Sequence, residues 1–205
     1  MLLTRFEKWM MQSALRRWGL RQVEAPRVFR GVNLPDGAEI LEIGCGYGDG
    51  ALLIARRFGG ARVVGVDLDE EIIAGARHKV ARPPRWARDV ATERITFVCG
   101  DAAALSFPEA AFDAALLFGM LHHINAWRRA IAEAHRVLKP GGVLALEEAL
   151  ISDRPWRFNR QFGHVPFDAS ELREALEAAG FRILRFDDPW YLPMCFVRAV
   201  KPAGM

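Results

Sequence analysis

A run of four glycines at alternate positions constrains the fold of this chain more than any other feature. The run occupies residues 44–50, follows an apolar stretch at 40–43 that holds one acid, and precedes a helix-like stretch at 51–57. The apolar stretch predicts a buried strand. Glycine lets the backbone approach a ligand closely, and the first turn of a helix offers unpaired N–H groups. We therefore expect a strand, a ligand-binding turn and a helix, which begin a βαβ unit.

A dinucleotide-binding turn is one explanation of these glycines. Its pattern, G-x-G-x-x-G/A, should open directly from the strand. Counted from Gly44 the last position is Asp49, which does not fit. Counted from Gly46 it is Ala51, which fits, but the turn then starts two residues late. The glycines alone therefore leave the ligand open.

Asp67 is a second sign of a ligand that contains ribose. It ends the predicted strand Arg62–Asp67 and lies 23 positions after Gly44. An acid about twenty residues beyond such a turn binds the ribose hydroxyl pair, because carboxylate oxygens can accept both O–H groups. Asp69 follows in the next helix, and we expect it to cap that helix.

Strands and helices alternate along the rest of the chain. Further strands are predicted at Ile95–Cys99, 111–118, 143–148, 181–186 and Met194–Val200, with a sharp turn at 139–142 before the fifth strand. Helices are predicted after Asp67, from Trp127 to about 138, and from 168 or 170 to 179. Nothing of crossover length separates the last two strands, so we expect them to pair antiparallel.

Residues 2–30 are predicted to form one or two amphipathic helices, with a break at Gly19. Apolar residues fall near helical spacing, and basic residues lie on the other faces. Two arrangements are open: the segment packs over the domain as a lid on the active site, which we favour, or it lies on a membrane surface. Glu7 and Gln12 weaken a membrane-binding face.

Composition indicates an ordinary globular protein. The 205 residues suffice for one domain with a sizeable core, and the net charge is only +3. No block of consecutive Lys or Arg exceeds two, so nucleic acid is not an expected partner. The three cysteines are far apart and indicate neither a disulfide framework nor a metal site. No apolar run approaches membrane-spanning length and no signal peptide is evident, so we expect a cytoplasmic protein.

Taken together, the segments resemble the class I S-adenosylmethionine-dependent methyltransferases, in particular small bacterial enzymes with an LHH motif. The matching segments are E-I-G-C-G-Y-G at 42–48, V-G-V-D at 64–67, G-D-A at 100–102, F-D at 112–113, L-H-H at 121–123 and H-R-V-L-K-P-G-G at 135–142. The resemblance implies a Rossmann-like three-layer α/β sandwich. Its mostly parallel seven-stranded sheet ends in an antiparallel last strand, unlike the sheets of nicotinamide-dependent enzymes. We divide this single domain into a helical cap at 1–34, a cofactor-binding core at 35–150 and an acceptor-side region at 151–205.

The resemblance also assigns residues to the methionine part of S-adenosylmethionine, whose product is S-adenosylhomocysteine. Gly44, Cys45 and Gly46 would contact it through the backbone. Glu42 would lie beneath the loop near the cofactor's amino group, and the carbonyl of Phe118 would accept from that group. Cys45 is interpreted as a small residue and not as a nucleophile.

Other residues are assigned by resemblance to the nucleoside. Asp67 would accept from both ribose hydroxyls, and Leu68 would cover the adenine. Asp101 would accept from the adenine amino group, with the backbone N–H of Ala102 donating to the ring. Gly48 completes the glycine pattern of the cofactor loop and is counted among the cofactor-binding residues.

Three histidines are candidate catalytic residues. His122 and His123 follow the fourth strand, at the strand end where ligands bind. His122 is expected to face the acceptor as a base or orienter, because histidine titrates near neutrality, whereas His123 is expected to tie the loop down. His164, in an aromatic segment, is the third candidate.

The acceptor is narrowed mainly by missing motifs. The sequence holds no Asn-Pro-Pro-Tyr motif, no Pro-Cys nucleophile and no evident acidic metal site, and Cys99 is expected to be buried in its strand. A small organic acceptor, aromatic or apolar, remains. A lipid or quinone-precursor methyltransferase at a membrane surface and a non-catalytic cofactor-binding module stay open. Oligomeric state is not determined: monomer and homodimer are both compatible.

Overall fold

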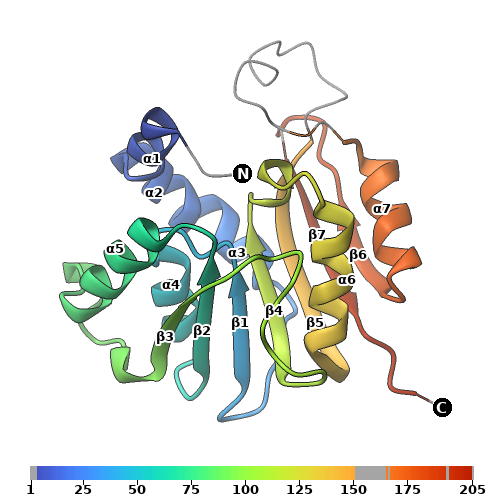
Figure 1. The fold of residues 1–205 in the computed structure, drawn as a ribbon, viewed down its shortest axis with the longest axis horizontal. Helices are drawn as coiled ribbons and strands as arrows, with labels where there is room; N and C mark the ends of the chain where they lie inside the picture. The colour runs from blue at the N-terminus through green and yellow to red at the C-terminus, as the bar shows by residue number, and fades with distance from the viewer. Residues whose placement is uncertain (1–3, 151–164, 166, 193, 205) are drawn as a thin grey trace.

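The computed structural model describes residues 4–150, 165, 167–192 and 194–204. A seven-stranded sheet with strand order β3-β2-β1-β4-β5-β7-β6 forms its centre (Figure 1). The strands are β1 (Glu39–Ile43), β2 (Arg62–Asp67), β3 (Ile95–Cys99), β4 (Phe112–Phe118), β5 (Leu138–Ala149), β6 (Arg182–Asp187) and β7 (Met194–Val200). The first five run parallel, and β7 is antiparallel to both β5 and β6. The antiparallel pairing expected of the last two strands is confirmed.

Helices cover both faces of the sheet. They are α1 (Arg5–Met11), α2 (Ala14–Gly19), η1 (Leu20–Glu24), α3 (Ala25–Val28), α4 (Asp49–Arg57), α5 (Glu70–Ala81), η2 (Arg85–Ala87), η3 (Thr92–Arg94), η4 (Leu121–His123), α6 (Trp127–Val137) and α7 (Ala169–Ala178). Because side chains alternate along a strand, neighbouring residues enter different cores. Ile40 packs with α3, α4 and α5, whereas Leu41 packs with α6 and α7. The result is the expected three-layer sandwich.

The order of the strands indicates which end of the sheet binds the ligand. The chain leaves β1 toward β2 and β3 on one side, then returns to build β4 and β5 on the other. Connections diverge at the carboxyl ends of β1 and β4, and open α/β sheets bind ligands in the crevice at such a switch point. Figure 1 shows α1 and α2 at this same end of the molecule.

The N-terminal segment differs from the sequence expectation in where it breaks. The helices are interrupted at Gln12 and Ser13, whereas Gly19 lies inside a continuous helical run that passes into the π-helix η1. Ser13 begins α2 because its hydroxyl accepts from the backbone N–H of Arg16. Lys8 joins α1 to the start of α5 through ion pairs with Asp69 and Glu71, both at 2.6 Å.

The turn expected at 139–142 is instead an irregular part of β5. Leu138 already pairs with Phe112, and the register shifts before Ala114 meets Val143. Lys139 holds the irregularity, since its Nζ donates to both carboxylate oxygens of Asp113 at 2.9 Å. Strand β5 therefore begins five residues earlier than expected, and its last residues reach the ligand-binding end.

Candidate active site

A cavity of about 540 Å³ lies at the carboxyl ends of β1, β2, β3, β4 and β5, with α1 and α2 contributing to its wall. Eight of the residues expected from the sequence line it: Gly44, Asp67, Leu68, Asp101, Ala102, Phe118, His122 and His123. A smaller cavity of about 60 Å³ adjoins it and shares Gly44 and Phe118. Its wall includes Glu42, Cys45 and Gly46. The fold thus brings these separate motifs to one place.

The glycine loop has a backbone that only glycine adopts readily. Gly44 has a φ of 73° and Gly46 a φ of 52°, both in the left-handed region. A Cβ on Gly44 would lie 2.8 Å from Met120, and one on Gly46 would lie 2.8 Å from Met11. The left-handed backbone and the close approach of the two methionines therefore both favour glycine at positions 44 and 46.

Asp67 is fixed by the loop that it faces. Its Oδ2 accepts from the N–H of Gly46 at 3.0 Å and its Oδ1 from the N–H of Asp69 at 3.2 Å. Burial raises the pKa of this carboxyl, and the backbone donors oppose that shift. Each oxygen keeps a second lone pair, so the carboxylate can still accept from two hydroxyls. Leu68, beside it, is 45% exposed and can cover a planar group.

Asp101 lies at the end of β3 in a tight turn. Its Oδ1 accepts from the N–H of Ala103 at 2.8 Å, which fixes the side chain against its own backbone. The side chain is exposed, whereas Ala102 is buried. The turn therefore offers a carboxylate oxygen and a backbone N–H side by side. This pair suits a nucleobase whose edge has a hydrogen-bond donor next to an acceptor.

Glu42 and Cys45 lie beneath the loop. Glu42 is buried, and within the described residues its Oε2 has no hydrogen-bond partner. Burial, followed by the nearby charges of Asp49 and Asp67, raises the pKa of Glu42 well above its ordinary value. Burial also raises the pKa of the Cys45 thiol, which agrees with its interpretation as a small residue and not a nucleophile.

Gly48 lines neither cavity. Its φ is 82° and it caps the start of α4, while a Cβ at this position would point at Phe97, 3.0 Å away, and at Ala76. Its position favours a role in joining the turn to α5 and β3. Phe118, by contrast, lines both cavities.

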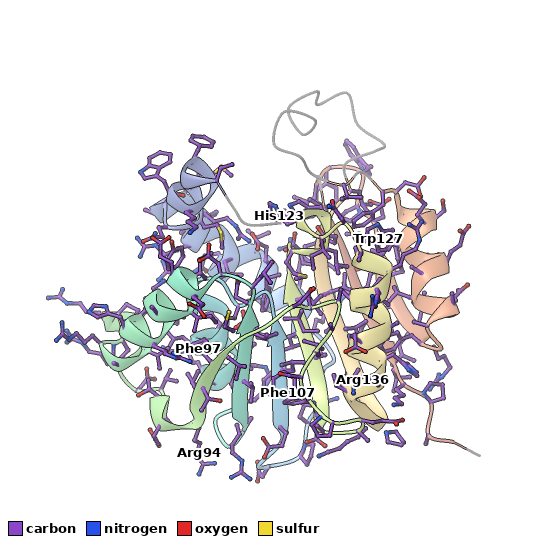
Figure 2. All side chains as sticks on the ribbon, in the orientation of Figure 1. Arg94, Phe97, Phe107, His123, Trp127 and Arg136 are labelled. Atoms are coloured by element: carbon purple, nitrogen blue, oxygen red, sulfur yellow. The ribbon has the colours of Figure 1, made fainter. Side chains whose placement is uncertain are left out.

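The LHH segment forms η4 at the cavity wall, and Figure 2 shows His123 at the ligand-binding end. The Nδ1 of His122 contacts Oε1 of Glu148, a carboxylate with no exposed surface. Glu148 also accepts from the N–H of Leu121 at 2.7 Å and of Ala149 at 2.9 Å. The His122 and His123 rings lie 4.2 Å apart. His164 lies outside the described residues.

Several residues that line the cavity, or that contact its lining as Glu148 contacts His122, were not anticipated from the sequence. Glu147 and Glu148 are adjacent at the end of an otherwise apolar strand, and this pair of acids is the signal that could have identified them. Arg16 and Glu24 come from the N-terminal helices, which the sequence favours as a lid without assigning any of their residues to the site. Four of the six methionines of the chain also line the cavity: Met10, Met11, Met120 and Met194.

The expected burial of Cys99 is wrong. Its side chain is exposed, with Sγ 3.4 Å from the carbonyl oxygen of Leu68. Ile95 and Phe97 of the same strand are buried, whereas Cys99 is the last residue of β3, where the strand leaves the core.

The described residues contain neither a metal-binding cluster nor a membrane-spanning helix. No group of three or more His, Cys, Asp or Glu side chains there is placed to hold a metal ion. Likewise, no helix in that part of the chain is long and apolar enough to cross a membrane.

Comparisons with known proteins agree with this geometry. A probable S-adenosylmethionine-dependent methyltransferase of Mycolicibacterium smegmatis is 35% identical over 150 residues, which cover 72% of this chain and 53% of the relative. A sterol 24-C-methyltransferase of Eremothecium gossypii is 29% identical over 182 residues, 78% of this chain and 47% of the relative. The chain thus spans about half the length of the curated relatives it matches.

A solved structure and a family model complete the comparison. The crystal structure of the [4+2]-cyclase SpnF superposes with a TM-score of 0.76 at 26% identity, covering 88% of this chain and 80% of that one. The family model described as "Methyltransferase domain" matches residues 41–146, which begin within β1 and end within β5. The glycine cradle and the unpartnered Glu42 oxygen fit S-adenosylmethionine, the cofactor of this domain. On its sequence match and its fold, the chain belongs to the S-adenosylmethionine-dependent methyltransferase domain family.

Proposed function

We propose that this protein transfers a methyl group from S-adenosylmethionine to a small, largely apolar acceptor. One observation supports this most directly: the glycine loop, Asp67, Asp101 and His122 all border the same cavity. The acceptor's lone pair attacks the methyl carbon, the carbon–sulfur bond breaks, and S-adenosylhomocysteine leaves as a neutral thioether. The protein has mainly to align three atoms, and alignment can supply roughly 7–11 kcal/mol of barrier reduction.

The cofactor is proposed to lie along the strand ends. Asp67 would accept from the ribose hydroxyls and Asp101 from the adenine amino group, with the N–H of Ala102 donating to the ring. The loop at 44–46 would hold the methionine part above Glu42, next to the carbonyl of Phe118. This order follows the order in which β3, β2, β1 and β4 lie in the sheet.

His122 is proposed to orient the acceptor or to remove its proton. Glu148 contacts Nδ1, so a neutral ring carries its hydrogen on that nitrogen and has Nε2 as its basic atom. Two backbone N–H groups fix Glu148 in turn. The imidazole is therefore held in one orientation at the cavity wall, which is what a base requires.

The methionines support an apolar acceptor. A methionine side chain is flexible and polarisable, so it adapts to apolar ligands of irregular shape. Four of them meet in this cavity together with Leu68 and Ile124. A purely ionic acceptor would gain nothing from such a wall.

The protein incubated with methyl-labelled S-adenosylmethionine and with apolar phenols, amines or lipids as acceptors tests the proposal. Formation of S-adenosylhomocysteine and of labelled acceptor is measured. We expect label in one chemical class and turnover that falls at least about a hundredfold in His122→Ala, the lower range for general base catalysis. His78→Ala, on α5 outside the cavity, is the matched control. Full turnover in His122→Ala would remove the histidine from the mechanism. Tight cofactor binding without turnover on any acceptor would favour a non-catalytic module.

A lipid acceptor at a membrane surface is the second candidate, and exposed aromatic side chains favour it. Helices α1 and α2 expose Phe6, Trp9, Leu15 and Trp18, and Leu15 is 78% exposed. Because β6 runs parallel to β5, the β6–β7 connection lies at the same end, and it exposes the aromatic pair 190–191. Aromatic rings beside basic residues are typical of proteins that lie in a membrane interface. Several similar relatives are named sterol 24-C-methyltransferases, whose name implies a lipid acceptor.

Sedimentation with vesicles discriminates this candidate. We expect the protein to pellet with vesicles that contain phosphatidylserine and to stay in solution when Trp9→Ser and Trp18→Ser are combined. Leu184→Ser, at an exposed apolar position on β6, is the control. Substitutions are preferable to removal of the N-terminal segment, because Leu20 and Ala25 belong to the core. Equal sedimentation of wild type and the double variant would exclude this surface.

A further inference from the structure

Three charged side chains meet at the cavity wall, two from the N-terminal helices and one from β5. Arg16 comes from α2, Glu24 from η1 and Glu147 from β5, and all three line the cavity. The Nη1 of Arg16 donates to both carboxylate oxygens of Glu24, at 2.8 and 2.7 Å. Glu24 is 6% exposed and Glu147 only 3%. We call these three residues the carboxyl-pair site.

One oxygen of this site has no partner. Within the described residues, Oε2 of Glu147 makes no hydrogen bond although it is buried. A Cβ on Gly119 would lie 3.3 Å from this oxygen, so only the absence of a side chain at residue 119 leaves space in front of it. A buried carboxyl oxygen without a donor is unfavourable, and native proteins rarely keep one unless something binds there.

The charges of the site do not balance. Two carboxylates and one guanidinium leave one negative charge, with Glu148 close behind. Burial, then the charges of Glu24 and Glu148, raises the pKa of Glu147 well above its ordinary value, and Arg16 opposes the shift. A cation that reached Oε2 would therefore lower the cost of ionising Glu147 in this buried place.

We propose that the carboxyl-pair site binds a cationic nitrogen of the methyl acceptor, so that the acceptor is an apolar molecule that bears one ammonium group. The ammonium donates to Oε2 of the ionised Glu147 carboxylate, and the proton that this carboxyl gives up goes to solvent. The apolar part of the molecule then lies against the methionines of the same cavity. This inference rests on the proposed methyl transfer and names the class of its acceptor.

Chain-length-matched probes test the inference without a known acceptor. The protein loaded with S-adenosylhomocysteine is titrated with octylamine, octanol and octanoate by calorimetry. We expect the amine to bind at least about tenfold more tightly than the alcohol, because hydrogen bonds to charged groups are worth about 1.5–3 kcal/mol. Titration in two buffers of different ionisation enthalpy should show about one proton released for each amine bound.

Glu147→Gln should abolish both the preference for the amine and the proton release. Glu109→Gln makes the same change at a residue whose side chain is 74% exposed, and should alter neither. Glu24→Gln leaves Arg16 to pair with Glu147 and should also abolish the preference, which keeps the test decisive if one variant does not fold.

The other outcomes overturn the inference. Equal binding of amine and alcohol by wild type would do so while leaving the methyl-transfer proposal standing, provided that S-adenosylhomocysteine binds. A loss of cofactor affinity in Glu147→Gln of more than about tenfold, with the amine preference unchanged, would mean that this carboxyl serves the cofactor. Failure of wild type to bind S-adenosylhomocysteine would refute both proposals.

Discussion

Glu148→Gln is the substitution that tests the proposed role of His122 in orienting or deprotonating the acceptor most sharply. The carboxylate accepts from three groups: the N–H of Ala149 and Nδ1 of His122 at Oε1, and the N–H of Leu121 at Oε2. A glutamine can accept only through its single amide oxygen, since its NH₂ is a donor. The oxygen should take the Oε1 position, where it keeps two bonds. The NH₂ then faces the N–H of Leu121, and two donors oppose each other in a buried place.

The expected magnitudes follow from these contacts. The opposed donors should lower the free energy of unfolding by about 1–3 kcal/mol, the cost of an unsatisfied buried group. For a chain of this size that corresponds to a melting temperature roughly 2–12 °C lower. Loss of the negative charge also removes about 1.5–3 kcal/mol of support for the imidazolium of His122. Turnover should therefore fall by roughly tenfold to a hundredfold.

Kinetic and melting measurements together distinguish a role of Glu148 in positioning His122 from a role in stabilising the fold. We expect kcat to fall and the affinity for S-adenosylhomocysteine to stay within about twofold. Glu109→Gln controls for the chemical change at an exposed site. Unchanged kcat, with the melting temperature lowered as calculated, would show that Glu148 only stabilises the loop.

Three further predictions concern the loop, the ribose site and the carboxyl pair. Gly44→Ala should weaken S-adenosylhomocysteine binding at least tenfold. The control Gly37→Ala has a similar φ of 75° and open space around it, so it should lose only about 1–2 kcal/mol of stability. Equal cofactor affinities of the two variants would contradict the proposed contact with the loop. Asp67→Asn should reduce that affinity by roughly tenfold to a hundredfold in calorimetry, since each charged hydrogen bond is worth about 1.5–3 kcal/mol; an affinity equal to wild type would exclude the ribose contact. Because the folded-state pKa of Glu147 is raised, the folded protein holds a proton that the unfolded chain releases above about pH 4.5, so this group's contribution to stability is complete below that pH and falls as pH rises through the folded pKa. Wild type should therefore lose more thermal stability than Glu147→Gln between about pH 5 and pH 9, and parallel melting curves would refute the raised pKa.

Local signals predicted most of the fold. The strands Arg62–Asp67, Ile95–Cys99 and Met194–Val200 begin and end as expected, because apolar runs bounded by glycine and polar residues determine strands locally. Asp69 caps α5 through the N–H of Glu71, as its position before the acids of that helix predicts. The turn expected at 139–142 was wrong because glycine and proline there accommodate an irregular strand whose pairing with β4 is a tertiary contact.

The glycine loop and Asp67 could be identified as a site because strand, turn and acid follow each other at a fixed spacing. Only the tertiary structure decided what lies opposite them. It joins His122 to Glu148, and Arg16 and Glu24 to Glu147, across more than a hundred residues in the second case. Such partners meet because β5 ends beside β4 and the N-terminal helices cross the same strand ends, and no local pattern records that meeting. The sequence by itself thus indicated the methyl donor and named His122 as the residue expected to face the acceptor, whereas the charged partners Glu148, Arg16, Glu24 and Glu147 were visible only once the chain was folded.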